Sequence, residues 1–366
     1  MESTVYQDKL PLSLAAGEEI DLVAVQTSAM VDQVKADLMP LEPLLNEHVG
    51  ADWSDQINET SIEQSRLLAD DGELYILPMG SLGSVVGYYN AEMLAEYGLE
   101  VPTTNAEFKE FADALAAQNP DVLPVVFTGA NWFQDEIVLT LIGQSDPSFF
   151  NEIRYNDGAW NTPEYVQTLE DYKQMYDDGI FSMDVIDLDY GRALELFYTG
   201  EAAILLQGTW EAGVLSEPFR QENSIELADV GLMPLPVMNE GDNPSIRSFI
   251  ELGMAVPVNS AHPEEAMKLL EFIVLGNGVD QWGPTFINVP GRLGYELPEG
   301  SLTSDAAVDG YNTLVELVQN PSSDRNNVSA FSAVVGDAII EVLNGSDAQE
   351  TADALQAEWE SGRYAP

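Results

Sequence analysis

The chain contains no cysteine. This absence excludes disulfide bonds, zinc sites built from thiolates and cysteine nucleophiles. Histidine is scarce as well: His48 and His262 are the two copies, and neither has a serine or acidic partner in a recognisable motif. A Ser-His-Asp catalytic site is therefore not expected.

Basic residues are few, since 13 Lys and Arg stand against 63 Asp and Glu, which gives a formal net charge of −50. Such a charge repels nucleic acid and anionic lipid, so neither is expected as a partner. Two interpretations of the acidity stay open: a solvated acidic surface suited to high salt, or an acidic site for cationic ligands. The first is favoured because the acidic residues are spread along the whole chain.

Long apolar runs are also missing. No stretch of the sequence approaches the roughly 20 apolar residues that a membrane-spanning helix needs. The N-terminal sequence MESTVYQDKLPL lacks the charged and apolar regions of a signal peptide. The chain as given is therefore expected to be soluble.

Motifs of common enzymes are absent: there is no G-x-S-x-G elbow, no G-x-x-x-x-G-K-S/T phosphate loop and no H-E-x-x-H. Among so many acidic residues, paired carboxylates occur by chance, so a glycosidase pair is not recognisable from spacing. Asp184, Asp187 and Asp189 could bind Ca²⁺, but an EF-hand Gly and Glu are missing, and a solvated loop before a helix is favoured. The sequence thus predicts no enzyme, no cofactor and no metal.

What is present is a regular alternation of helix and strand patterns over 366 residues, a length typical of about two domains. Apolar spacing predicts helices over residues 106–118, 163–179, 263–278 and 333–345. Short β-branched or apolar runs predict strands over residues 20–25, 122–127, 202–207 and 253–258. This order indicates an α/β architecture with largely parallel sheets.

The tryptophans separate into two groups. Trp53, Trp160 and Trp359 lie in contexts typical of packing, and Trp282 is ambiguous. Trp132 and Trp210 each follow a predicted strand at the point where a helix begins, and ligands bind at the carboxyl edge of open α/β sheets. Their rings could stack on a sugar, with hydroxyl-binding neighbours at Asn131, Gln134, Asp135, Glu136 and Glu211. The alternative is that both rings cap a core.

Several motifs resemble those of extracellular solute-binding proteins of carbohydrate ABC transporters, the family that includes maltose-binding protein. The segment LPMGSLGSVVGYYNAEMLAEYGLEVPTTNAEFKEFADAL (77–115) carries the most specific match. FYTGEAAILLQGTW resembles the family's Phe-x-x-Gly-(Lys/Glu)-Ala-Ala-Met and Gly-x-Trp motifs, and GMAVPVNSAHPEEAMKLLEFI resembles its Pro-Glu-x-Ala helix entry. YQDKLPLSLAAGEEIDLVAV resembles a first-lobe strand, with Ile20 where a Pro is usual. The resemblance runs from about Tyr6 to Trp359.

The resemblance implies a type II periplasmic-binding-protein fold, an α/β fold of two lobes with the ligand cleft between them. It places residues 1–89 and 253–318 in lobe 1 and residues 90–252 and 319–366 in lobe 2. The family's usual first strand, helix and strand are not found before the KL…DLV segment, so either the chain is shortened or lobe 1 is built differently. The lipoprotein signal with its cysteine is also absent from the sequence given.

The family's site residues carry over to five places. Trp210 matches the stacking tryptophan and is the leading candidate, with Glu211 beside it. The other candidates are second-lobe residues Asn131, Trp132, Phe133, Asp135 and Glu136, first-lobe residues Gln26, Thr27 and Ser28, Arg247, Ser248 and Phe249 before a crossing strand, and Phe331 as a second stacking aromatic.

The expected function is binding of a carbohydrate, an oligosaccharide in particular, and its delivery to the permease subunits of an ABC transporter. The protein is expected to be a monomer outside the cytoplasm, lipid-anchored at the cell surface or periplasmic in its full-length precursor. Two alternatives stay open: a binding protein of the same fold for a polyamine, peptide or metal complex, and a carbohydrate-active enzyme.

Overall fold

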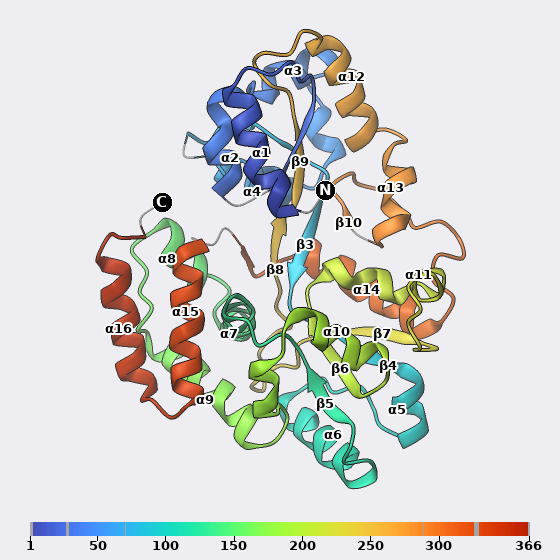
Figure 1. Cartoon of the computed structure of the whole chain (residues 1–366), viewed down its shortest axis with the longest axis vertical. Helices are drawn as coiled ribbons and strands as arrows, with labels where there is room; N and C mark the ends of the chain where they lie inside the picture. Colours follow the sequence, from blue (N-terminus) through green and yellow to red (C-terminus); the bar gives the residue numbers. More distant parts are fainter. Residues whose placement is uncertain (1–2, 27–28, 70, 288, 326–328, 365–366) are drawn as a thin grey trace. The chain divides into compact units, whose positions relative to one another are not determined.

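The computed structural model describes residues 3–26, 29–69, 71–287, 289–325 and 329–364. The chain divides into two compact units (Figure 1). Unit 1 comprises residues 1–82 and 249–298, and unit 2 comprises residues 83–248 and 299–366. The segment 299–318, which the resemblance assigned to lobe 1, falls in unit 2, because its helix α14 (Asp305–Gln319) packs against strand β7 (Val230–Pro234) of that unit.

Unit 1 holds a small sheet in the order β1-β9-β2, in which β1 and β2 both run antiparallel to β9. A further strand, β10, pairs antiparallel with β3. The strands are β1 (Val23–Gln26), β2 (Leu77–Pro78), β3 (Gly80–Ser84), β9 (Leu252–Ala255) and β10 (Val289–Pro290). The helices are α1 (Ser3–Ala15), α2 (Ala29–Val34), α3 (Leu41–His48), α4 (Glu59–Leu67), α12 (Pro263–Val274) and α13 (Val279–Phe286), with 3₁₀ turns η1 (Lys35–Asp37) and η2 (Trp53–Gln56).

Unit 2 is built on a sheet in the order β5-β6-β4-β7. Its strands are β4 (Val86–Asn90), β5 (Leu123–Val126), β6 (Ala202–Gln207) and β7, and β8 (Arg247–Ile250) pairs in parallel with β11 (Ser323–Asp324) through residues of this unit. The helices besides α14 are α5 (Ala91–Tyr97), α6 (Asn105–Gln118), α7 (Asn131–Ser145), α8 (Phe149–Tyr155), α9 (Pro163–Asp177), α10 (Tyr190–Tyr198), α11 (Glu217–Glu222), α15 (Ser329–Leu343) and α16 (Ala348–Glu360), with 3₁₀ helices η3 (Met183–Asp187) and η4 (Thr209–Leu215).

The predicted helices and strands are confirmed, with ends that differ by a few residues. Local signals explain several boundaries. Thr104 and Glu107 form a reciprocal capping box at the start of α6. Thr162 caps α9, and Pro163 occupies its first turn, where no backbone donor is needed.

The expectation of largely parallel sheets is wrong. In unit 2, β5 and β6 are parallel, but β4 runs antiparallel to both of its neighbours, β6 and β7. The unit 1 pairs are antiparallel. The alternation rule assumes that consecutive strands join the same sheet through a helical crossover. Here β9 pairs with strands that lie far earlier in the chain, so helix and strand alternation does not determine strand direction.

The core of unit 2 explains why α7 is buried around most of its circumference. Strand β6 is fully buried, as its unbroken run AAILLQ predicts. Helix α15 packs along α7, and Gly336 allows this approach, because a Cβ there would lie 2.2 Å from the Asn131 carbonyl oxygen. Figure 1 shows α15 beside α7, with α16 alongside α15.

Over the described residues, no helix has the length and apolar character required to span a membrane.

Candidate ligand-binding site

Two tryptophans meet at the edge of the unit 2 sheet. Strand β5 leads through residues 127–130 into α7, where Trp132 is the second residue, and β6 leads through Gly208 into η4, which carries Trp210. Because β5 and β6 are parallel neighbours, their carboxyl ends lie at the same edge. The ring centroids of Trp132 and Trp210 are 6.2 Å apart with an interplanar angle of 47°, and both side chains are partly exposed. Their predicted placement at strand ends is therefore confirmed.

The Trp210 ring is held by its own neighbourhood. Its Nε1–H donates a hydrogen bond of 2.9 Å to the hydroxyl of Tyr190. The Tyr190 hydroxyl donates in turn to Glu211, and the Tyr198 hydroxyl donates to the other Glu211 oxygen at 3.0 Å. Burial and the nearby Glu211 carboxylate raise the pKa of both tyrosines. The tyrosines therefore stay neutral donors over the physiological pH range.

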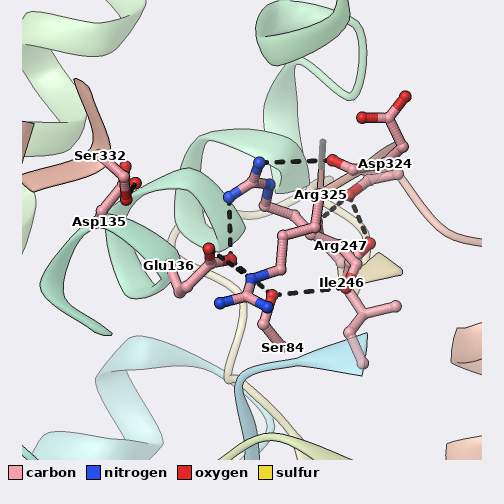
Figure 2. Close-up of polar contacts among 10 residues, drawn as sticks. Ser84, Asp135, Glu136, Ile246, Arg247, Asp324, Arg325 and Ser332 are labelled. Atoms are coloured by element: carbon pink, nitrogen blue, oxygen red, sulfur yellow. Dashed lines mark hydrogen bonds and ion pairs between the residues drawn. The ribbon is translucent and has the colours of Figure 1, made fainter. Parts of the chain in front are cut away.

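A guanidinium group lies beside the two indoles. The Cζ of Arg325 is 5.9 Å from the ring centroid of Trp132 and 5.9 Å from that of Trp210, within the range of a cation–π contact. Its Nε donates to Glu136 Oε1 at 2.7 Å, so α7 fixes the position of the guanidinium (Figure 2). We call Trp132, Trp210, Arg325, Tyr190 and Glu211 the aromatic site.

Behind the aromatic site, Glu136 joins a buried charge network. Arg247 Nη1 lies 2.9 Å from Glu136 Oε2, and the Ser84 hydroxyl donates to the same carboxylate at 2.6 Å (Figure 2). The Arg247 guanidinium also stacks 4.2 Å from the centroid of the Phe150 ring. Burial by itself would raise the pKa of Glu136, but the positive charges of Arg247 and Arg325 outweigh it and hold that pKa below its usual range.

The adjacent Asp135 has the opposite environment. Burial, together with the neighbouring Glu136 charge, raises the pKa of Asp135 to about 7. The Ser332 hydroxyl of α15 donates to its Oδ2, whereas Oδ1 has no hydrogen-bond partner within the described residues. Asp135 and Trp160 line a cavity of about 20 Å³, room for a single water molecule.

The structure places the remaining sequence candidates as follows. Phe133 and Phe331 are buried in the unit 2 core, with Phe331 packed on Trp160, Trp359 and Tyr364, so packing describes these two positions better than ligand contact does. Asn131 donates to Asp337. Of the remaining candidates, Ser248 is buried on β8 in unit 2, and Phe249 and Gln26 belong to unit 1, where Gln26 donates to Glu251. Thr27 and Ser28 lie outside the described residues.

The site also contains residues that sequence reasoning missed. Tyr190 and Arg325 lie outside the motifs that carry the resemblance, and Tyr198 lies within FYTGEAAILLQGTW at a position that the family motif leaves open. The roles of all three depend on contacts with η4 and α7. The acidic loop that could have bound Ca²⁺ has a structural explanation, because Asp189 caps α10 by accepting from the Arg192 backbone N–H at 2.8 Å. Over the part of the chain that the structure describes, no group of three or more His, Asp or Glu side chains could hold a metal ion.

Comparisons with known proteins give a consistent picture. The family model of bacterial extracellular solute-binding proteins matches residues 1–275. An uncharacterized ABC transporter extracellular-binding protein of Pyrococcus horikoshii is 21% identical over 360 residues, which cover 93% of this chain and 74% of that protein. Lipoprotein LipO of Bacillus subtilis is 24% identical over 325 residues, which cover 82% of this chain and 61% of LipO.

Solved structures agree in fold. A chitin oligosaccharide binding protein superposes with a TM-score of 0.76 at 21% identity, covering 99% of this chain and 88% of that one. A maltose-bound protein of T. maritima gives a TM-score of 0.72 at 18% identity, covering 98% and 89%. A solute-binding protein of Agrobacterium radiobacter in complex with ribitol gives a TM-score of 0.70 at 21% identity, covering 99% and 90%.

Proposed function

Since this chain belongs to the family of bacterial extracellular solute-binding proteins, we propose that it binds a carbohydrate, an oligosaccharide in particular, and delivers it to the permease of an ABC transporter. The α/β two-lobe fold implied by the sequence resemblance is confirmed by the structural matches. Those neighbours include proteins described with chitin oligosaccharide, maltose and ribitol, which supports a carbohydrate as the solute of this one.

The observation that carries the proposal is the pair of partly exposed indoles at the edge of the unit 2 sheet, 6.2 Å apart, with a guanidinium beside both. An indole face packs on the C–H face of a sugar ring, and guanidinium N–H groups donate to hydroxyls. Two rings inclined at 47° present two such faces, which suits a ligand of more than one sugar unit.

The polar groups at the aromatic site favour binding over catalysis. Glycoside hydrolysis needs one carboxylic acid and one carboxylate that reach the scissile bond. Here both Glu211 oxygens accept from tyrosine hydroxyls, and Glu136 is fully buried between two guanidinium groups. We therefore propose a binding protein without turnover.

We further propose that the protein acts outside the cytoplasm as a monomer, lipid-anchored at the cell surface or periplasmic. The extracellular family and the similarity to a lipoprotein support this location. The permease subunits of the transporter are the protein partners that this role requires.

The proposal is tested by a thermal-shift screen with mono- and oligosaccharides, with polyamines and amino acids as comparison ligands. A ligand at 100 times its dissociation constant stabilises the folded state by about 2.7 kcal/mol, which gives a measurable rise in Tm. We expect one class of glycan to raise Tm, and titration calorimetry then gives its Kd.

Two matched variants assign the binding to the site. Trp210→Ala is expected to weaken binding of that glycan by about 30-fold or more, as for a central aromatic contact. Trp282→Ala is the control, because Trp282 is also partly buried and also donates its Nε1–H, to the Ile273 carbonyl oxygen of unit 1. A response to polyamines without any response to sugars would contradict the carbohydrate proposal, and release of shortened oligosaccharides would contradict the absence of turnover.

A further inference from the structure

We propose that Tyr190 and Glu211 are positioning residues that hold the Trp210 indole in the orientation it needs for stacking on a sugar ring. This inference rests on the proposed carbohydrate function. It also changes the role of Glu211, which the sequence suggested as a direct partner of sugar hydroxyls.

The hydrogen bonds from Trp210 to Tyr190 and from Tyr190 to Glu211 have a fixed donor-to-acceptor direction. An indole N–H is a donor only, so the Tyr190 oxygen must accept from Trp210. The hydroxyl hydrogen of Tyr190 is then directed to Glu211, whose carboxylate is an acceptor only. Tyr198 supplies the second donor to the same carboxylate at 3.0 Å. Glu211 therefore acts on Trp210 through Tyr190, by fixing the direction of the Tyr190 hydroxyl.

A second constraint acts on the face of the ring. The Trp210 indole lies over Gly208, where an added Cβ would be 2.1 Å from one ring carbon. Gly208 is itself held in place, because its carbonyl oxygen accepts from the Tyr88 hydroxyl at 3.0 Å. A tryptophan side chain has two rotatable bonds, and an edge contact together with a face contact restricts both.

Such restriction has a direct consequence for affinity. Ordering a side chain on binding costs free energy, and a side chain that is already ordered in the free protein avoids that cost. The expected effect of releasing the edge contact is therefore a weaker complex, with the contact surface of Trp210 still present. We expect the Kd of the glycan to rise about 3- to 10-fold.

The decisive comparison is Tyr190→Phe against Tyr198→Phe. Both variants remove one hydroxyl that donates to Glu211, but only Tyr190→Phe removes the acceptor of the Trp210 N–H. We expect Tyr190→Phe to raise the Kd 3- to 10-fold and Tyr198→Phe to change it less than 2-fold. Glu211→Gln, in which the amide can still accept from one tyrosine, is expected to fall between them.

A second readout is independent of any ligand. In the free protein, the ¹⁵N–¹H signal of the Trp210 indole, assigned by its loss in Trp210→Phe, should move upfield and exchange faster with water in Tyr190→Phe, and should stay in place in Tyr198→Phe. Equal effects of the two tyrosine variants on this signal, or an unchanged signal in Tyr190→Phe, would overturn the positioning role. If no glycan binds even to the unaltered protein, the carbohydrate function fails, while the indole signal still decides whether Tyr190 orients Trp210.

Discussion

The guanidinium of Arg247 lies 2.9 Å from the carboxylate of Glu136, and both side chains are fully buried. Arg325 contacts the other oxygen of the same carboxylate and reaches outward to the two indoles of the aromatic site. Figure 2 shows Arg325 and Arg247 on the carboxylate of Glu136. Arg325 is partly exposed and Glu136 is not, so the buried ion pair anchors Arg325 beside the two rings. The stability of unit 2 and the geometry of its site thus depend on the same carboxylate.

Replacing the carboxylate of Glu136 should lower the stability of the folded protein. Glu136→Gln leaves two guanidinium groups without their counter-charge, and breaking a buried ion pair by removing one partner typically costs about 3–5 kcal/mol. We expect a loss of that order in the free energy of unfolding from urea denaturation. Asp113→Asn is the control, because Asp113 forms an exposed pair with Lys109 at 2.8 Å and should change stability by about 0.5 kcal/mol or less. Equal effects of the two substitutions would argue against a structural role for the buried network.

A methyl group at Gly208 should displace the Trp210 ring. Gly208→Ala places a Cβ within van der Waals overlap of the indole, and we expect a loss of stability of about 1–3 kcal/mol together with weaker glycan binding. Gly191→Ala is the matched control, since this exposed glycine lies in helix α10 and an added Cβ would lie 3.6 Å from Asp189 Oδ1, an ordinary van der Waals distance. That control should be stabilising by about 0.5–1 kcal/mol. An unchanged tryptophan fluorescence spectrum and Kd in Gly208→Ala would count against the face contact.

The buried Asp135 predicts a dependence of stability on pH. Its pKa is raised from 3.8 to about 7 in the folded state, so the fold retains a proton that the unfolded chain loses in this interval. The protonated Asp135 therefore contributes its full stabilisation below about pH 4. As the pH rises to about 7 this contribution is lost, and the free energy of unfolding falls by about 2–4 kcal/mol. Glu136, whose pKa is lowered, acts in the opposite sense and only in more acidic solution.

The measurement is the difference in unfolding free energy between the unaltered protein and Asp135→Asn from pH 4.5 to 8. Asn cannot ionise, so the variant should lose stability less steeply over this range and should be the more stable of the two at pH 8. Parallel curves would show that Asp135 does not titrate between these values.

The net charge of −50 predicts a response to salt. Like charges repel in the compact state, and raising the ionic strength from 0.1 to 1 M shortens the screening length from about 10 Å to about 3 Å. We expect Tm to rise as sodium chloride is added up to molar concentration. A Tm that stays constant or falls would contradict an acidic surface adapted to high salt.

Much of the local structure follows from the sequence. The caps at Thr104 and Thr162 and the apolar spacing after them depend on residues a few positions apart, so the helices were predictable. The same holds for the positions of Trp132 and Trp210 after apolar runs that become β5 and β6. The absence of cysteine is likewise a property of the sequence alone, and it excludes disulfide bonds and thiolate metal sites.

Other features depend on which distant segments meet. No local signal in the sequence predicts that β4 runs antiparallel to β6, that Phe331 is buried or that Tyr190 contacts Trp210. Each of these features depends on packing between separate parts of the chain. The sequence suggested Glu136 as a partner of sugar hydroxyls, but its side chain is fully buried, and its two arginine partners come from β8 and from the segment after β11. Sequence by itself determined the helices, the approximate positions of the strands and the family. Tertiary structure alone decided which charges are paired and how Trp210 is held, since hydrogen bonds and ion pairs act over a few ångströms in space, whatever the separation along the chain.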